Sequence, residues 1–237
     1  MQHSSLPAWI PASVPPPLDD NEIHVWLVSL ADADCRPAWL DAAERARLER
    51  MADPRGRALF CASRSILRQL LAGYLGVQPD AVVLEIEAGG KPVVAGQALH
   101  FNLSHARDTL LLAFCRNRPL GIDLEYPRPL QNLAQMARRI FSPQEIQALE
   151  GEDDPQERFF EFWTRLEAIQ KCVGTGIFGA REGADRVQHL GFTIGPAQAC
   201  VAWQAAEPVQ PHPTLRHFRH GAATRPGGTS RDCNARG

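Results

Sequence analysis

The short run Gly-Ile-Asp-Leu-Glu at 121–125 alternates apolar and acidic residues. As a β-strand this run places Asp123 and Glu125 on one face, because successive side chains of a strand point to opposite sides. The apolar positions then point the other way, into a core: Leu120, Ile122 and Leu124. Two carboxylates on one face of a strand suit the binding of a hard divalent cation.

A second stretch, Trp-Thr-Arg-Leu-Glu-Ala-Ile-Gln-Lys at 163–171, follows about forty residues later and is predicted to be helical. It carries Glu167 and Lys171 one turn apart on the same side. If this helix lies against the strand, three carboxylates and an amine meet, and such a site could bind a divalent cation together with a phosphate group. The two stretches together indicate a phosphoryl-type transfer.

Each pattern also has an ordinary structural interpretation. An Asp-x-Glu strand is most often a solvated polar face. A Glu–Lys pair at this spacing is commonly a surface pair that contributes about 0.3–0.5 kcal/mol. Motifs elsewhere in the chain decide between the two interpretations.

Further motifs lie upstream, Gly-Lys-Pro at 90–92 and Phe-Asn-Leu-Ser-His at 101–105. In order and approximate spacing the four motifs resemble those of the 4′-phosphopantetheinyl transferases, of the larger, single-chain, surfactin-synthetase-activating type. The helix with Arg64-x-x-x-Arg68 and the segment 139–145 add to the resemblance, which runs from about residue 22 to about residue 176. Any one of these motifs is unspecific, but together and in this order they are specific.

The resemblance implies an α/β (α+β) fold of two similar lobes in a pseudo-twofold arrangement, with the active site between them. It implies transfer of the 4′-phosphopantetheine arm of coenzyme A to a carrier-protein serine, with release of adenosine 3′,5′-bisphosphate. Asp123, Glu125 and Glu167 are then the ligands of Mg²⁺, or of Mn²⁺, and Glu167 or a water that it holds is the base for the serine hydroxyl.

The same resemblance assigns the residues that bind coenzyme A. Lys171 and Lys91 are expected to reach the phosphates, and Ser104 and His105 to meet the nucleotide, with His105 near the 3′-phosphate. Seven arginines between residues 44 and 68 suggest a phosphate-facing patch, in which Arg47 is the best candidate. Each of these side chains could instead be an ordinary surface or structural residue.

The carrier protein is expected to dock its acidic helix on a patch over residues 128–140. Arg128, Arg138 and Arg139 flank an apolar segment there, and a basic rim around apolar anchors suits such a partner. Many family members carry Lys immediately before the helix glutamate, where this chain has Leu166. We expect Leu166 to be buried, so that the phosphate contact is either missing or supplied by Arg165.

Bulk properties are those of a soluble globular protein. The 237 residues are 44% hydrophobic and 22% charged with a net charge of −2, which gives no indication of a nucleic-acid partner. No window approaches 18 apolar residues, and the N-terminus does not resemble a signal peptide. The six cysteines are scattered, and we expect reduced thiols in a cytoplasmic monomer that binds no membrane.

The chain divides into four parts on composition and predicted elements. Residues 1–21 form a flexible Pro-rich arm, 22–117 a first lobe, 118–204 a second lobe, and 205–237 a disordered tail. Strands are predicted at 22–27, 82–87, 98–102, 109–115, 119–125, 187–194 and 199–203. Helices are predicted at 38–51, 56–75 and 155–173, with a further helix start at Ser142. Nothing from residue 205 onward has the pattern of a strand.

Two other functions remain open. One is a metal-dependent phosphohydrolase or nucleotidyltransferase, against which Lys91, Ser104 and His105 weigh, because hydrolysis of a small phosphoester needs no long nucleotide clamp. The other is a non-catalytic relative that only binds carrier proteins, which would not need all three acidic positions.

Overall fold

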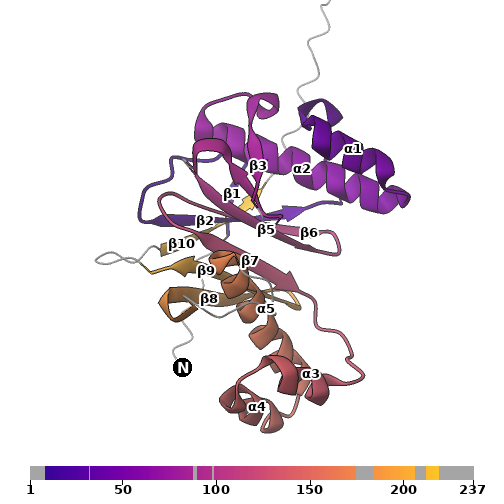
Figure 1. The fold of residues 1–237 in the computed structure, drawn as a ribbon, viewed down its shortest axis with the longest axis vertical. Helices are drawn as coiled ribbons and strands as arrows, with labels where there is room; N and C mark the ends of the chain where they lie inside the picture. Colours follow the sequence, from indigo (N-terminus) through magenta and orange to yellow (C-terminus); the bar gives the residue numbers. More distant parts are fainter. Residues whose placement is uncertain are drawn as a thin grey trace, which may run out of the picture.

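The structure, a computed structural model, describes residues 9–31, 33–87, 90–97, 99–174, 184–205 and 212–218. Figure 1 shows α1 and α2 at one end of the molecule, α3 and α4 at the other, and the β-sheets between them. Two α/β lobes meet in the middle, which confirms the predicted fold class.

The first lobe is built on a five-stranded sheet with the order β1-β10-β2-β6-β5. The bounds of its strands are, in chain order, Ile10–Ala12 (β1), Glu22–Ser29 (β2), His100–Ala106 (β5), Thr109–Cys115 (β6) and His212–Phe218 (β10). β2, β6 and β5 are antiparallel, whereas β10 runs parallel to both β1 and β2. A short hairpin of β3 (Leu84–Ile86) and β4 (Pro92–Val94) lies outside this sheet.

Two helices cover one face of the first lobe, α1 (Ala42–Arg50) and α2 (Pro54–Leu75). The Asp53 carboxylate accepts two backbone N–H groups at the start of α2, and the helix ends at Gly76, whose φ of 69° suits glycine. The stop predicted at Gly76 is therefore confirmed. Short 3-10 turns complete the connections of the chain: Pro37–Trp39, Pro79–Ala81, Ala95–Gln97 and Ala184–Arg186.

The second lobe repeats this plan with a three-stranded antiparallel sheet of order β7-β9-β8. Its strands are β7 (Leu120–Glu125), β8 (Val187–Ile194) and β9 (Ala197–Gln204), and α5 (Pro155–Val173) covers one face. In both lobes the first strand pairs with the last and the last with the middle one, β2-β6-β5 and β7-β9-β8, as a pseudo-twofold repeat requires. The opposite face of the second sheet packs on the first in a shared apolar core.

A helical extension leads away from the sheets and contains α3 (Leu133–Ile140), α4 (Pro143–Glu150) and the first half of α5. Its own apolar cluster is built around Phe141, Phe159 and Phe162. Ser142 and Glu145 form a capping box at the start of α4, as the sequence predicts.

The prediction that no strand follows residue 205 is wrong. β10 lies between β1 and β2, where Leu215 fills the core shared by the sheets and Phe218 fills the core under α2. A strand with two neighbours needs few large side chains of its own, because both ladders and both cores stabilise it. The predicted tail therefore contributes a strand to the first lobe, and residues 219–237 lie outside the described ranges.

Two smaller expectations are also corrected. The alternation of Ile23, Val25 and Leu27 with Glu22, His24 and Trp26 predicts a half-buried β2, but His24 and Trp26 are fully buried as well, because α2 covers the face on which they lie. The Pro-rich arm contains β1, which pairs with β10 at the edge of the sheet, and residues 1–8 lie outside the described ranges.

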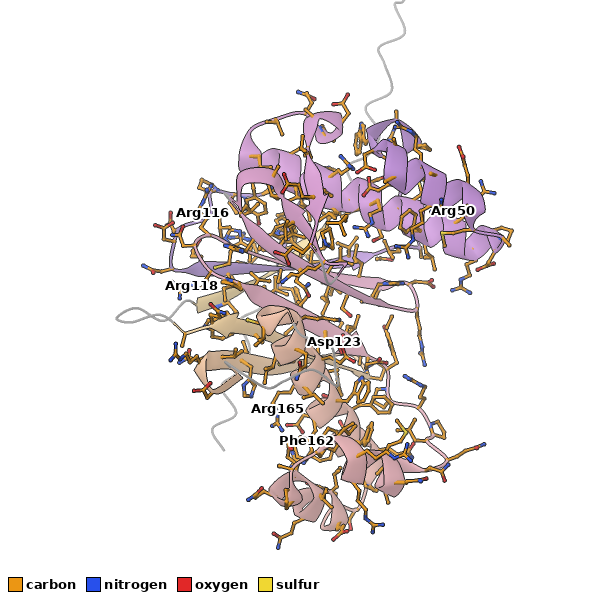
Figure 2. All side chains as sticks on the ribbon, in the orientation of Figure 1. Arg50, Arg116, Arg118, Asp123, Phe162 and Arg165 are labelled. Carbon is orange, nitrogen blue, oxygen red and sulfur yellow. A yellow bond between two sulfur atoms is a disulfide. The ribbon has the colours of Figure 1, made fainter. Side chains whose placement is uncertain are left out.

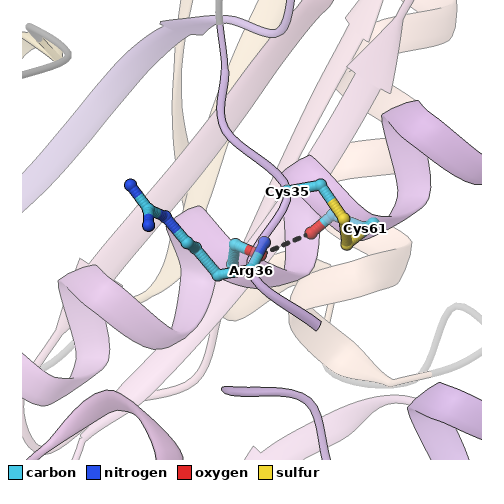
Figure 3. Close-up of a disulfide and its surroundings, with 4 residues drawn as sticks. Cys35, Arg36 and Cys61 are labelled. Atoms are coloured by element: carbon cyan, nitrogen blue, oxygen red, sulfur yellow. Dashed lines mark hydrogen bonds between the residues drawn. A yellow bond between two sulfur atoms is a disulfide. The ribbon is translucent and has the colours of Figure 1, made fainter. Parts of the chain in front are cut away.

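The expectation that all six cysteines are reduced thiols is wrong for two of them. Cys35, before α1, forms a disulfide with Cys61 on α2 (Figure 3), and the neighbouring Arg36 N–H donates to Ser65 Oγ. Cys115, Cys172 and Cys200 are free and buried, and Cys233 lies outside the described ranges. Cys35 and Cys61 are 26 residues apart in the sequence, and their spacing matches no known disulfide pattern. They become neighbours only in the fold, so the sequence did not predict the pair.

Among the helices that the structure describes, none is long and apolar enough to cross a membrane.

Candidate active site

The acidic strand faces α5, as the alternation of its residues predicts. Gly121 and Asp123 lie on the side of β7 that meets the helix, whereas the apolar residues enter the shared core: Leu120, Ile122 and Leu124. At Gly121 the helix comes so close that a Cβ would lie 2.1 Å from Ala168 O and 2.5 Å from Cys172 N. Only glycine allows this approach, which brings the side chains of α5 to β7.

Asp123 is the centre of the site and lies at the junction of the two lobes (Figure 2). The residue is only 5% exposed, and its Oδ1 accepts hydrogen bonds from Lys171 Nζ at 2.6 Å and Ser104 Oγ at 2.9 Å. Lys171 Nζ also donates to Ile122 O at 3.2 Å. The other carboxylate oxygen, Oδ2, is buried and has no hydrogen-bond partner among the described residues. A buried carboxylate with one unpaired oxygen favours a cation beside it.

Glu167 and Glu125 complete the acidic group. Burial raises the pKa of Glu167, and the negative charges of Asp123 and Glu125 raise it further against the opposing effect of Lys171. This effect requires the carboxylates of β7 and α5 to lie near one another. Glu125 also accepts a hydrogen bond from Arg128 at 2.8 Å.

The donor set fits a hard cation, although its side chains are not arranged as a finished metal site. Within the described ranges, no group of three or more His, Cys, Asp or Glu residues is close enough to hold a metal. Lys171 and Arg128 act as the counter-charges of Asp123 and Glu125. Carboxylate oxygens alone, with one of them buried and unpaired, suit Mg²⁺ or Mn²⁺ rather than zinc.

Lys91 reaches the second lobe from the turn before β4. Its Nζ donates to Lys171 O at 2.9 Å and Leu120 O at 3.2 Å, and burial lowers its pKa. An ammonium group has three N–H donors, so these two bonds leave one for a phosphate oxygen. The structure thus adds a contact between the lobes that the sequence did not indicate.

Ser104 and His105 lie next to each other on β5 and point in different directions. Ser104 binds Asp123, whereas His105 is exposed, and partial desolvation together with Lys171 and Arg64 lowers its pKa. The positive charges of Lys171 and Arg64 beside His105 favour the binding of an anion at this position.

Two adjoining cavities lie beside these residues. One of about 360 Å³ is lined by residues that include Arg64, Lys91, Asn102 and Lys171. The other, about 580 Å³, lies between α1, α2 and the β3–β4 hairpin, and its lining includes Arg47, Arg50, Phe60, Arg64 and Ile86. Arg64, Gly90 and Pro92 line both cavities.

The arginines of α1 and α2 have different environments. Arg47 and Arg64 lie over the Phe60 ring at 4.9 and 5.4 Å from its centroid and face the larger cavity. Arg68 is 1% exposed and donates to Glu44, Asp41 and the carbonyl of Val82, so it is a structural residue that fixes the start of α1. The sequence signal for this structural role was the pair Asp41 and Glu44, which lie three residues apart at the start of α1.

Arg165 does not face the acidic group. It forms an ion pair with Glu145 of α4 and lies over the Phe162 ring (Figure 2), so it ties α5 to the helical extension. The sequence left open whether Arg165 supplies the phosphate contact of the lysine that Leu166 replaces. The placement of Arg165 favours the other alternative, that this contact is missing. Leu166 is partly rather than fully buried, against the apolar cluster of the extension.

The predicted docking patch lies on the helical extension. A groove of about 220 Å³ is lined by Leu133, Ala137, Ile146 and Leu149. Its charged lining residues are Arg138, Glu150 and Glu152, so the rim is not purely basic as the sequence predicts. Arg128 pairs with Glu125 and lies over the Phe160 ring at 5.2 Å from its centroid, so it connects the patch with the acidic group.

Comparisons with known proteins identify the family to which the chain is similar. A family model described as the 4′-phosphopantetheinyl transferase superfamily matches residues 119–208. The 4′-phosphopantetheinyl transferase HetI of Nostoc sp. is 38% identical over 224 residues, which cover 88% of this chain and 90% of that protein. The 4′-phosphopantetheinyl transferase psf-1 of Bacillus pumilus is 37% identical over 177 residues, covering 68% of this chain and 74% of that protein. The likeness to the Nostoc protein extends over both lobes, and the chain belongs to the 4′-phosphopantetheinyl transferases.

Proposed function

We propose that this chain transfers the 4′-phosphopantetheine arm of coenzyme A to a serine of an acyl or peptidyl carrier protein. Membership of the 4′-phosphopantetheinyl transferase family supports the transfer of this group to a carrier protein. We further propose that the reaction is magnesium-dependent and releases adenosine 3′,5′-bisphosphate. The observation that supports this finer statement is that Asp123 and Glu125 lie within electrostatic range of Glu167, with Lys171 bound to Asp123.

The three carboxylates would hold Mg²⁺ or Mn²⁺, with the buried Oδ2 of Asp123 as the first ligand. The cation would neutralise negative charge on the pyrophosphate oxygens as the bond to the arm breaks. Lys171 then exchanges part of its bond with Asp123 for a phosphate oxygen. Ser104 keeps Asp123 oriented throughout.

Glu167 is the proposed base for the serine hydroxyl. A carboxylate whose pKa is raised by burial and by neighbouring negative charge accepts a proton more readily than an ordinary surface glutamate. Proton transfer from the hydroxyl to Glu167 makes the serine oxygen the nucleophile at the phosphorus atom. The displaced oxygen leaves with the adenosine bisphosphate.

Coenzyme A is long, and we propose that it binds along the two adjoining cavities. We assign its pyrophosphate to Lys91 and Lys171, and its 3′-phosphate to His105, with Arg47 of the larger cavity as a further phosphate-binding candidate. Arg64 lines both cavities, and its charge, after desolvation and Lys171, contributes to the lowered pKa of His105. The carrier protein would bind along the patch at 128–140, beside the groove on α3 and α4.

The test is incubation of the protein with coenzyme A, Mg²⁺ and an apo-carrier protein. The mass of the carrier protein should rise by one phosphopantetheine group, and adenosine 3′,5′-bisphosphate should appear in equal amount. A carrier protein with its acceptor serine changed to alanine and a reaction with a chelator are the controls. Hydrolysis of coenzyme A without modification of the carrier protein would favour a phosphohydrolase instead, and binding without reaction a non-catalytic relative.

A further inference from the structure

One edge of β7 is not paired with another strand by backbone hydrogen bonds in the described part of the chain. β9 pairs with the other edge, and β7 ends the three-stranded sheet. Side chains instead bind the polar groups of the free edge. Ile122 N–H donates to Asn102 Oδ1 at 2.9 Å, Ile122 O accepts from Lys171, and Leu120 O accepts from Lys91.

The strand nearest to this edge is β5 of the first lobe. β5 and β7 are neighbours in space but belong to different sheets, so no backbone ladder sets their register. Asn102 and Ser104 are two residues apart on β5 and therefore lie on one face. They bind two consecutive residues of β7, the N–H of Ile122 and the carboxylate of Asp123.

We propose that Asn102 is a positioning residue for Asp123. Its amide oxygen takes the place of the missing ladder acceptor and fixes the peptide between Gly121 and Ile122, one residue before Asp123, relative to β5. Ser104 and Lys171 can then share one oxygen of Asp123, which leaves the other free for a cation. The proposal rests on the proposed function of this site.

The hydrogen bond between Ile122 and Asn102 explains how β7 is positioned against β5, because it joins a strand of each lobe. The peptide groups on both sides of the Ile122 Cα are bound on this edge, the first N–H by Asn102 and the following C=O by Lys171. Without Asn102, Ser104 is the remaining residue of β5 whose side chain donates to β7 within the described residues. Asn102 also lines the smaller cavity, so the competing role is direct contact with coenzyme A.

The experiment compares Asn102→Ala, Asn102→Asp and the wild type. The alanine variant should lose about tenfold to a hundredfold in kcat, as for a small displacement of a catalytic group. Its KM for coenzyme A should stay within about twofold, because an interaction that only aligns the reacting groups changes turnover rather than binding. Calorimetry with Mn²⁺ on the free enzyme should show weaker binding.

Amide hydrogen exchange tests the bond itself. In Asn102→Ala the N–H of Ile122 should exchange faster, while the N–H of Val201 on β9 keeps its protection. Asn102→Asp retains an acceptor in the same place, so it should keep the protection of Ile122 and most of kcat, while its added negative charge raises KM. Asn21→Ala, in the exposed turn before β2, is the matched control and should match the wild type in all readouts.

Unchanged exchange at Ile122, or a rise in KM alone, would overturn the proposal. Should the alanine variant fail to fold, Asn102→Ser replaces it, because a serine hydroxyl is too short to reach the Ile122 N–H. If the wild type modifies no carrier protein, the proposed function fails, yet exchange at Ile122 and the affinity for Mn²⁺ still decide the role of Asn102.

Discussion

The ammonium group of Lys171 on α5 lies 2.6 Å from Oδ1 of Asp123 on β7, and Ser104 on β5 donates to the same oxygen. One carboxylate oxygen thus joins a helix and a strand of the second lobe to a strand of the first. The second oxygen of Asp123 is buried and has no partner among the described residues. Lys171 is therefore the main counter-charge of Asp123 in the free enzyme.

Replacing Lys171 with Met should leave Asp123 without that counter-charge. We expect a loss of about 1–3 kcal/mol in the free energy of unfolding, because a buried charged group loses a partner. Mg²⁺ should restore part of the stability, since it supplies another positive charge. Thermal unfolding with and without Mg²⁺ checks this, with Arg128→Met, which removes a more exposed ion pair, as the control. Equal effects of Mg²⁺ on both variants would contradict the prediction.

Glu167→Gln should abolish transfer and leave the fold intact. The change removes one charge from the acidic group and a base from the reaction, at almost constant volume. Because burial and neighbouring carboxylates already disfavour the charged form of Glu167, its loss should not lower stability at neutral pH. Activity is measured by carrier-protein mass and folding by circular dichroism. Near-wild-type turnover in the folded variant would remove Glu167 from the mechanism.

His105→Ala should weaken the binding of coenzyme A more than that of dephospho-coenzyme A. Only the former carries the 3′-phosphate, and a charged hydrogen bond to it contributes about 1.5–3 kcal/mol. The pKa of His105 is lowered in the free protein, so the difference between the two ligands should grow as the pH falls and the imidazole becomes charged. Calorimetric titrations of both ligands at two pH values measure it. Equal losses for the two ligands would give His105 a structural role.

Gly121→Ala should strongly destabilise the second lobe. The new methyl group would lie 2.1 Å from the carbonyl oxygen of Ala168, so α5 would have to move away from β7. Overpacking of this kind costs about 1–3 kcal/mol or more, and the shift would also separate Lys171 from Asp123. Gly191→Ala on β8 is the control, because its nearest neighbour would be 4.0 Å away. Denaturant unfolding of both variants should show a large loss for Gly121→Ala only.

Truncation after Gln204 should lower the melting temperature clearly. It removes β10, and with it the ladders to β1 and β2 and two buried side chains, Leu215 and Phe218. Each large buried side chain contributes about 1.5–3 kcal/mol. Leu215→Ala in the full chain separates the loss of core packing from the loss of the strand. A truncated protein as stable as the full chain would show that β10 is dispensable.

Local patterns predicted most of the elements of the second lobe and the facing of its site. The alternation at 121–125 and the apolar stripe of 155–173 are periodic, and their capping signals are strong, so β7 and α5 follow from short-range rules. The convergence of Asp123 with Lys171 was expected only if strand and helix met. The family resemblance, rather than periodicity, supplied that condition.

Long-range contacts could not be predicted in the same way. The bond from Ile122 to Asn102, the disulfide from Cys35 to Cys61 and the pairing of β10 all depend on which segments become neighbours. The composition of 205–237 does not predict β10, because this strand is stabilised mainly by its pairing with β1 and β2 and by packing in the two cores. Arg68 is similar, since an arginine that fixes α1 and one that binds phosphate look alike in sequence.

The position of β10 also constrains how the protein can be made. His212 pairs with Glu22, so the sheet of the first lobe stays open at β2 until a strand about 190 residues later has been synthesised. The two lobes therefore cannot mature one after the other on the ribosome, although domains generally fold in that order. The sheet of the second lobe can form first, while the edge of β2 stays unpaired until β10 has been synthesised. This high contact order favours slow folding and makes chaperone protection of nascent chains valuable.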